Sequence, residues 1–387
     1  MDLLIVGSGL FGLTVAERAA MSGLKVVIVE KRNHIGGNAF SYKDSNTNID
    51  IHKYGSHIFH TSNQIVWDYV NRYTEFNNYV HKVYTRYNNE IYSMPINLGT
   101  INQFFKAALS PSEAKNLILG QKFSNNSSRS DSLEEKAISL IGEDLYLAFI
   151  KGYTKKQWQV DPSELPAEII TRLPIRYNYN NSYFDDIWQG IPKSGYTNWF
   201  ERMVDHKNIE IHYNSDFFDP KSIYFKGSTV GQLPIVYTGP VDQYFNHSYG
   251  SLLWRTLDFE IETLMTNDFQ GNSVINYANE EIPFTRIHEF KHLHPEQNEL
   301  YELNSTVIMK EFSRMSSVQD EPFYPVNSEK DRKILNNYRQ IQVNEKNVYF
   351  GGRLGTYKYL DMHMAIASAL TLWKNQLSVK FGVLSLE

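Results

Sequence analysis

The amino-acid sequence predicts an α/β fold: a discontinuous Rossmann-like domain with an inserted helical domain and an antiparallel β-sheet domain. Two observations near the N-terminus support this fold class. Leu3–Val6 is an apolar run of strand length, and the glycine motif GSGLFG follows at residues 7–12. A helix-forming stretch then leads to a second apolar run, residues 25–29, which ends at Glu30. This order of strand, glycine turn, helix, strand and acid is a dinucleotide-binding βαβ unit.

Each residue of this unit has a physical role. Gly7 permits a tight turn, and Gly9 lets the main chain approach a pyrophosphate. Gly12 lets the helix pack closely on the strand, with its N-terminal amides directed at the anion. Glu30 ends the second strand, where a carboxylate can accept both hydroxyl groups of an adenosine ribose.

A second glycine pair separates the possible cofactors. Lys31 follows the acid, and the segment continues to Gly36, Gly37 and Asn38. NAD dehydrogenases usually lack such a second glycine turn, whereas FAD proteins of the amine-oxidase and mutase type have one. The longer cofactor lies along more main chain. The sequence therefore favours FAD.

Composition narrows the class of protein. The chain has 387 residues, 42% hydrophobic and 21% charged, which is typical of a soluble globular protein of one to three domains. The net charge of −5 disfavours nucleic-acid binding. No apolar run is long enough to span a membrane, no signal peptide is visible, and there are no cysteines. A cytoplasmic location is expected.

The remaining elements predict a discontinuous architecture. The clearest helices are residues 64–73 and 133–149, and residues 88–90 are expected to turn a hairpin. Strands are expected at residues 209–213, 233–237, 254–262, 273–277, 306–312 and 348–350. The FAD-binding domain is expected to consist of three separate segments, residues 1–75, 201–250 and 326–387. Between them we expect a helical insert (76–150), a mobile substrate loop that returns to the FAD domain (151–200) and an antiparallel-sheet substrate domain (251–325).

Two histidines three residues apart, His57 and His60, raise the question of a metal. Neither carboxylate nor cysteine ligands lie near them at suitable spacing. Polar contacts to a cofactor or substrate are the expected role, and no metal site is predicted.

With these segments in view, the chain resembles the prokaryotic UDP-galactopyranose mutases over essentially its whole length. The resemblance rests on EKRNHIGGN at residues 30–38, IHKYGSHIFH at 51–60, KGYTKKQW at 151–158, FTRI at 284–287, EPFYPVN at 321–327, GGRL at 351–354 and YLDMH at 359–363. The first motif is shared with other flavoproteins, and the middle ones are specific to this family.

The resemblance implies a role for each matched residue. Tyr153 and Trp158 correspond to a uracil-binding pair, and Tyr183, Tyr324 and Tyr359 to tyrosines that contact the phosphates. The substrate-binding residues it implies are Phe149, Tyr153, Trp158, Tyr183, Asn276, Tyr324, Tyr359, Asp361, His57 and His60. The cofactor-binding residues expected from motif and resemblance together are Gly7, Gly9, Phe11, Gly12, Glu30, Lys31, Gly37, Asn38, Thr238, Gly239, Gly352, Arg353 and Met362.

Two arginines are the expected catalytic residues. By resemblance, Arg172 lies on a mobile loop that closes over the diphosphate, and Arg286 is a second phosphate ligand. Two guanidinium groups suit a diphosphate leaving group. Arg176 is four residues from Arg172, so which of the two contacts the substrate stays open.

The activity implied is the interconversion of UDP-galactopyranose and UDP-galactofuranose, a redox-neutral ring contraction that supplies galactofuranose for cell-surface glycans. By resemblance, N5 of reduced FAD attacks the anomeric carbon. A homodimer and an unidentified reductant such as NAD(P)H are further expectations. The alternatives are an FAD-dependent oxidase or dehydrogenase of the amine-oxidase type, a UDP-sugar-binding protein with structural FAD, and a mutase of broader range that accepts UDP-N-acetylgalactosamine or UDP-arabinopyranose.

Overall fold

A computed structural model describes residues 1–121, 132–167, 175–317 and 319–383. Its first domain is built on a five-stranded parallel sheet with the order β16-β10-β1-β2-β9. The strands are β1 (Leu3–Val6), β2 (Val26–Val29), β9 (Ile209–His212), β10 (Ile235–Tyr237) and β16 (Val348–Phe350). This is the doubly wound order of a Rossmann domain, and the strand order reverses between β1 and β10.

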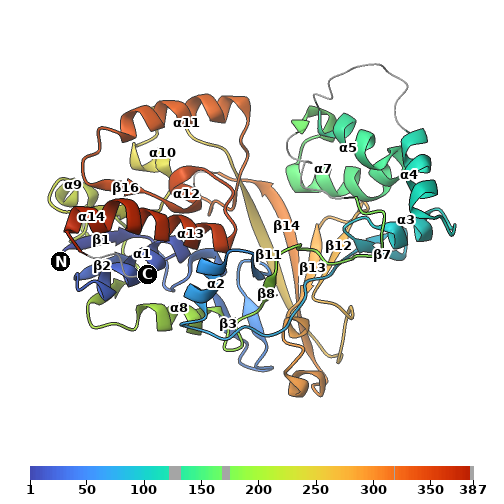
Figure 1. Cartoon of the computed structure of the whole chain (residues 1–387), viewed down its shortest axis with the longest axis horizontal. Helices are drawn as coiled ribbons and strands as arrows, with labels where there is room; N and C mark the ends of the chain where they lie inside the picture. The colour runs from blue at the N-terminus through green and yellow to red at the C-terminus, as the bar shows by residue number, and fades with distance from the viewer. Residues whose placement is uncertain (122–131, 168–174, 318, 384–387) are drawn as a thin grey trace.

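The apolar runs of this sheet are buried on both faces. Leu3 and Ile5 of β1 pack with helices α1 (Leu10–Met21), α8 (Tyr196–Val204) and α13 (Met362–Leu372) on one face. Leu4 and Val6 pack on the other face, with Tyr237 and with side chains from the segments that follow β9 and β10. Continuous apolar strands are what a parallel sheet covered on two faces requires. In Figure 1 this domain lies on the left.

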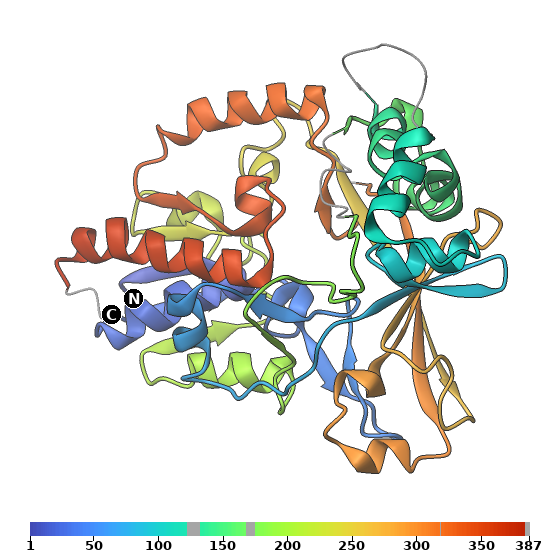
Figure 2. The same ribbon diagram turned by 45° about the vertical axis from the view of Figure 1, so that its right-hand side comes forward.

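The chain leaves this domain twice, and the two excursions share one seven-stranded sheet with the order β15-β11-β14-β13-β12-β6-β7. The first excursion, between β2 and β9, supplies β6 (Val83–Tyr87) and β7 (Glu90–Met94). The second, between β10 and β16, supplies β11 (Trp254–Leu264), β12 (Val274–Tyr277), β13 (Arg286–Glu289), β14 (Thr306–Met315) and β15 (Tyr324–Pro325). Figure 2 shows this sheet beside the first domain.

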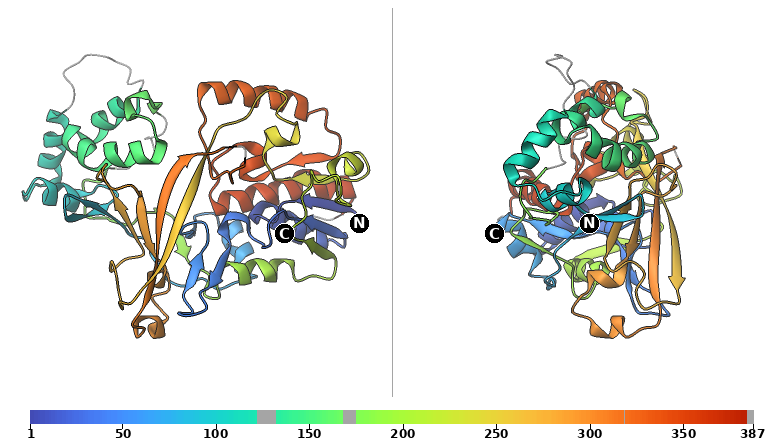
Figure 3. Two further views of the ribbon diagram at one scale, coloured as in Figure 1. Left: turned by 180° about the vertical axis from the view of Figure 1, so that it is seen from behind. Right: turned by 90° about the vertical axis from the view of Figure 1, so that its right-hand side faces the viewer.

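A helical segment covers one end of that sheet. Its helices are α3 (Leu98–Phe104), α4 (Pro111–Gly120), α5 (Leu133–Ile141), α6 (Glu143–Leu145), a π-helical turn (Tyr146–Lys151) and α7 (Gly152–Trp158). They enclose a separate apolar core around Ile101, Ile118, Ala137 and Tyr146. The left view of Figure 3 shows this segment standing apart from the parallel sheet.

The remaining strands and α-helices differ in length. They are β3 (Ser41–Lys43) paired with β4 (Asp50–His52), β5 (Phe59–Thr61) paired with β8 (Trp188–Gly190), α2 (Gln64–Val70), α9 (Lys226–Thr229), α10 (Val241–Tyr244), α11 (Glu329–Gln342), α12 (Gly352–Thr356) and α14 (Ser378–Phe381).

Three local features differ from the sequence expectation. The helix expected at 133–149 is interrupted at Gly142, which has φ 80° and ψ 161° and cannot continue a helix. The expected hairpin forms, but its strands β6 and β7 belong to the seven-stranded sheet although they lie within the segment 76–150. That sheet is not wholly antiparallel, because β6 pairs with β12 in parallel.

The structure also bears on membrane insertion. No helix within the described ranges combines the length and the apolar character that are needed to cross a membrane.

Candidate active site: two joined clefts

The first cleft opens where the ends of β1, β2 and β10 meet. Its lining includes the glycine turn after β1, Glu30 after β2, and Thr238 and Gly239 after β10. This is the switch point of the sheet, where open α/β sheets bind their ligands. Every residue predicted to bind the cofactor, from Gly7 to Met362, lines this cleft.

The glycine geometry fits a dinucleotide. Gly7 has φ +100°, and a Cβ on Gly12 would lie 2.2 Å from the carbonyl oxygen of Gly7. A Cβ on Gly9, by contrast, would have no described atom within 4 Å. Gly9 is also the N-cap of α1, whose first turn has no acidic residue. The main chain therefore leaves open space and free amides at the place that a pyrophosphate occupies.

Glu30 is held in position by the glycine turn itself. Its Oε2 accepts hydrogen bonds from the amide and the hydroxyl group of Ser8, each at 2.8 Å, and its Oε1 accepts one from the amide of Arg32 at 2.9 Å. The acid at the end of β2 is thus oriented before any ligand arrives. The residues of this cleft fit the adenosine and pyrophosphate of FAD.

The second cleft begins where the first ends. Asn38, His57, Arg353 and Met362 line both. Its walls come from the seven-stranded sheet, from α7 and from the segments around β5 and α13. All the residues predicted to contact the substrate line it, namely Phe149, Tyr153, Trp158, Tyr183, Asn276, Tyr324, Tyr359, Asp361, His57 and His60, and so does the predicted catalytic Arg286.

The other predicted catalytic residue, Arg172, lies outside the described residues. Its neighbour Arg176 is described and does not line the cleft. The Arg176 guanidinium donates to the carbonyl oxygen of Ser182 and, at 2.8 Å, to Oδ1 of Asp185. Both contacts join Arg176 to residues of its own loop.

Arg286 is a cation of the second cleft that is held from two sides. It stands directly opposite Glu311 in the β13–β14 register, and its Nε lies 3.3 Å from Oε1 of Glu311. Its guanidinium also donates to the hydroxyl group of Tyr153. Burial alone raises the pKa of Glu311, but Arg286 and His288 beside it lower that pKa to about 2. Glu311 is therefore ionised, and Arg286 is held as a cation.

Two tyrosines and an arginine form the wall near the junction of the clefts. The rings of Tyr324 and Tyr359 stack with centroids 5.6 Å apart. The guanidinium of Arg353 lies 5.6 Å from the first centroid and 5.1 Å from the second, and it donates to the carbonyl oxygens of Phe323 and Leu360. Cation–π contact and hydrogen bonds together fix this wall.

The wall that α7 forms depends on a residue that sequence reasoning did not single out. The ammonium group of Lys156 donates to the carbonyl oxygens of Tyr277, Asn279 and Phe284, at 2.6, 2.8 and 3.1 Å. It thereby ties α7, which carries Tyr153 and Trp158, to the strands β12 and β13. Burial lowers the pKa of Lys156 to about 8.

Other missed residues are Arg255, Ser56, His288 and Glu311. The buried Arg255 donates to the carbonyl oxygen of Trp158 at 3.1 Å and to Oγ of Ser313 at 2.9 Å. Ser56 lies between β4 and β5, and for Arg255, His288 and Glu311 the only signal in the sequence is a charged or polar side chain in a strand. That signal is also what a solvent-facing strand residue gives.

Two amide side chains face the cleft with unused acceptors. Oδ1 of Asn276 and Oε1 of Gln157 are buried, and neither has a hydrogen-bond partner among the described residues. Both residues line the second cleft. Buried acceptors of this kind are normally satisfied, so they suit donors of a ligand such as the N–H groups of a pyrimidine base or a ribose hydroxyl group.

The other residues predicted to bind the substrate have different surroundings. Nδ1 of His60 lies 2.6 Å from Oδ2 of Asp186, and its ring stacks on Phe184. Phe149 packs mainly in the aromatic core of the helical segment, between Tyr92 and Phe104. The side chain of Tyr183 is nearly half exposed.

Tyr357 is two residues from Tyr359, but it does not share its face. It adopts a left-handed conformation with φ 50°, because the chain turns there at the end of α12. Its side chain is buried against Trp254. Tyr357 is therefore a core residue, whereas Tyr359 lines the second cleft.

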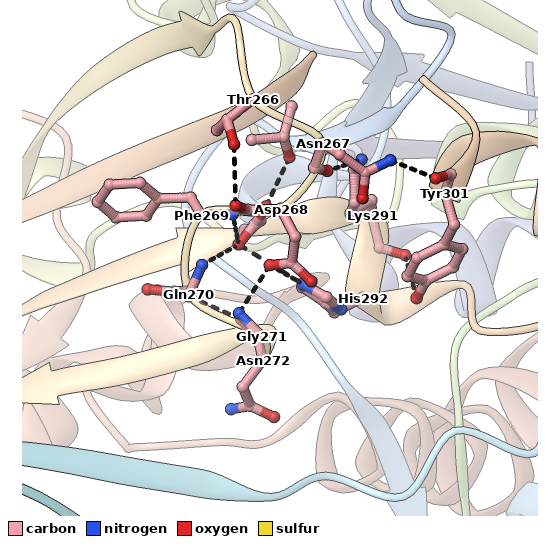
Figure 4. Close-up of polar contacts among 12 residues, drawn as sticks. Thr266, Asn267, Asp268, Phe269, Gln270, Gly271, Asn272, Lys291, His292 and Tyr301 are labelled. Carbon is pink, nitrogen blue, oxygen red and sulfur yellow. Dashed lines mark hydrogen bonds and ion pairs between the residues drawn. The ribbon is translucent and has the colours of Figure 1, made fainter. Parts of the chain in front are cut away.

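One group of side chains outside both clefts has the composition of a metal site. Within the described ranges Asp268, Glu289 and His292 bring a ligand atom each within 4.8 Å of one another. However, the amides of Phe269 and Gln270 and the hydroxyl group of Thr306 already donate to Glu289. The Gly271 amide donates to Asp268 (Figure 4). Through these hydrogen bonds the cluster holds the loop between β11 and β12 in place.

Comparison with known proteins agrees with this arrangement. The sequence profile of the UDP-galactopyranose mutase family matches residues 148–359, and that of an NAD(P)-binding Rossmann-like domain matches residues 5–73. A probable UDP-galactopyranose mutase of Klebsiella pneumoniae is 42% identical over 369 residues, covering 95% of this chain and 93% of the relative. The dTDP-fucopyranose mutase of Escherichia coli is 40% identical over 375 residues, covering 95% and 96%.

A solved structure shares the fold. The crystal structure of a reduced UDP-galactopyranose mutase superposes with a TM-score of 0.75 at 14% identity, covering 98% of this chain and 96% of that one. A putative protoporphyrinogen oxidase from Exiguobacterium gives a TM-score of 0.64, also at 14% identity.

The fold and the joined clefts, taken with these relatives, define a nucleotide-sugar mutase that interconverts pyranose and furanose rings. The chain belongs to the UDP-galactopyranose mutase family.

Proposed function

We propose that this protein is a UDP-galactopyranose mutase, which interconverts UDP-galactopyranose and UDP-galactofuranose with reduced FAD in the first cleft. The observation that carries the proposal is the pair of joined clefts. A dinucleotide-shaped cleft meets, at His57 and Arg353, a second cleft that holds the fixed cation Arg286. A redox-neutral ring contraction needs such a junction, because cofactor and anomeric carbon must meet there while the diphosphate is kept nearby.

Reduced FAD, when bound, supplies the nucleophile for the anomeric carbon. The residues of the chain supply position and charge. Arg286 stabilises the negative charge that gathers on the departing nucleotide and keeps the nucleotide bound for its return. Trp158 and Tyr153 hold the base, while Tyr324 and Tyr359 hold the diphosphate. Arg172 is proposed as the second phosphate ligand on the basis of the sequence resemblance.

A second candidate is the corresponding reaction of dTDP-fucopyranose. The specific support is the Escherichia coli relative of that name, which is nearly as similar as the Klebsiella pneumoniae relative. The two substrates differ in a methyl group on the base, a hydroxyl group on the ribose and a hydroxyl group on C6 of the sugar. Met94, Ile96 and Ile150 line the second cleft near Phe149, and an apolar wall of this kind accepts either base.

The test is anaerobic incubation of the purified yellow protein with UDP-galactofuranose or dTDP-fucofuranose, each with and without dithionite. Chromatography of the nucleotide sugars is the readout. Conversion of UDP-galactofuranose only under reduction is the expected result. Conversion of the fucose compound alone selects the second candidate. Bound flavin with no conversion in either arm selects an oxidase, and a substrate-driven bleaching screen would then identify its substrate.

The same preparation addresses three lesser proposals. UDP-N-acetylgalactosamine and UDP-arabinopyranose test the sugar range. Replacing dithionite by NADH or NADPH tests the reductant. Sedimentation tests the homodimer that the family resemblance implies, and a monomer at assay concentration would contradict it.

A further inference from the structure

A chain of polar contacts runs beneath the second cleft from the phosphate arginine to the cofactor side. Oε1 of Glu311 lies 3.3 Å from Nε of Arg286, and Oε2 lies 3.1 Å from Nε2 of His288. Nδ1 of His288 lies 2.8 Å from Oγ of Ser56. Ser56 adjoins His57, which lines both clefts. Four side chains thus lead from Arg286 to Ser56, the residue before His57 in the chain.

The middle of this chain is sealed from solvent. The side chains of Glu311 and His288 are 5% and 2% exposed. Thr285 gives a further hydrogen bond, 3.2 Å long, to Oε1 of Glu311. Burial lowers the pKa of His288, so the ring is neutral. Its Nε2–H then donates to the carboxylate, and its Nδ1 accepts from the hydroxyl group of Ser56.

A buried carboxylate is an unfavourable choice for a cleft that receives a diphosphate. It repels the substrate, and it offsets part of the attraction that Arg286 exerts on a diphosphate. A role in fold stability alone does not explain its position, because an apolar pair at these cross-strand positions stabilises a sheet at least as well. The carboxylate contributes to the orientation of the Arg286 guanidinium. An arginine side chain has many rotamers, and the ion pair with Glu311, together with the hydrogen bond to Tyr153, restricts the guanidinium to this wall of the cleft.

We propose that Glu311 is a positioning residue: it orients Arg286 and, through His288 and Ser56, fixes the distance between that arginine and the His57 segment at the cofactor cleft. This inference rests on the proposed function, in which the two sites act on one nucleotide sugar. Glu311 lowers the affinity for the free nucleotide and raises the rate of turnover. A merely structural carboxylate would affect both quantities in the same direction.

The test uses Glu311→Gln, which keeps the shape of the side chain and removes its charge. In the oxidised protein we expect UDP to bind about 3- to 10-fold more tightly, because a repulsive charge of order 1 kcal/mol is gone. In the reduced protein we expect kcat to fall about 30-fold, with the flavin content unchanged. Ser56→Ala should lower kcat about 3-fold without affecting the affinity for UDP.

The matched control is Glu289→Gln. Glu289 is a fully buried carboxylate on the same sheet, but it binds the loop before β12 and lines neither cleft. This variant should unfold at a lower temperature and keep its affinity for UDP and its kcat. If it matches Glu311→Gln in both quantities, loss of any buried carboxylate explains the effect and the proposal fails.

A double-mutant cycle separates this inference from the proposed function. In an Arg286→Ala background, Glu311→Gln should still strengthen UDP binding, because the repulsive charge is removed there too, but it should no longer lower kcat. An equal loss of kcat in both backgrounds overturns the inference, as does an unchanged kcat in the parent background. If the parent protein converts no nucleotide sugar, the proposed function fails, and an affinity for UDP that Glu311→Gln leaves unchanged would overturn the inference as well.

Discussion

The two clefts of this protein are built in opposite ways. The first is formed largely by main chain: glycines 7, 9 and 12 follow one strand, and residues 238 and 239 follow the next strand in the sheet. The second is formed by side chains from β12, β13, β14, α7 and the segments near β5 and α13. A cleft made of main chain depends on close approach, whereas a cleft made of side chains depends on what holds each side chain. The two should therefore respond differently to substitution.

The largest expected effect is that of replacing Arg286, which should damage the second cleft and leave the first intact. Arg286→Ala should lower kcat about 100- to 1,000-fold while the flavin stays bound, because it removes a fixed charge from the second cleft only. Steady-state kinetics and visible absorbance give the two readouts. Arg314→Ala is the control: Arg314 bridges Asp258 and Asp320 outside both clefts. Full activity of the Arg286 variant would refute its assigned role.

The opposite experiment damages the first cleft alone. Gly12→Val should reduce the ratio of bound flavin to protein at least tenfold, because its Cβ would lie 2.2 Å from the carbonyl oxygen of Gly7. UDP titration of the flavin-poor protein should still show binding. Gly120→Ala provides the comparison, since a Cβ there has no described atom within 4 Å. A fully loaded Gly12 variant would contradict the close packing.

A smaller effect is expected where the walls of the second cleft are tied together. Lys156→Met should raise KM for the nucleotide sugar about tenfold, because it leaves three carbonyl oxygens of the β12–β13 turn without their donor. Kinetics measured beside Lys155→Met provide the check. Lys155 forms an exposed ion pair with Glu280, so its loss should change KM less than twofold. Equal effects of the two variants would show that the buried ammonium has no positioning role.

The smallest effect concerns pH and the junction of the clefts. Burial lowers the pKa of His57 to about 4, and those of His52 and His81 to about 3. Unfolded histidines take up protons first as the pH falls below about 6.5, so acidification favours unfolding. The free energy of unfolding should decrease by up to about 1.4 kcal/mol per pH unit for each such group between pH 6 and 4. Urea titrations at several pH values should show that the free energy of unfolding of His57→Gln changes less with pH than that of the parent protein. An unchanged dependence on pH would mean that His57 is not buried in its neutral form.

The same contrast explains what could be read from the sequence. The βαβ unit was predictable because glycine spacing, strand length and Glu30 all lie within thirty residues and act locally. The nucleotide-sugar residues were named only through family resemblance, since Trp158, Arg286 and Tyr324 lie on α7, β13 and β15, which are distant in the sequence and come together only in the folded protein. Glu311 and Lys156 were not found at all. Their function depends on what lies opposite them, and neither a charged residue in a strand nor a lysine in a helix gives a local signal of that.

The parallel pairing of β6 with β12 has a consequence for how the chain can be divided. Each excursion from the Rossmann domain contributes only some strands of the seven-stranded sheet, and this pairing is the seam between them. Neither excursion cut out alone would close its hydrogen-bond ladder, and each would expose an unpaired strand edge. The seven-stranded sheet therefore cannot be moved to another protein as one contiguous segment. It can be transferred only together with the Rossmann domain, whose strands separate its two parts in the sequence.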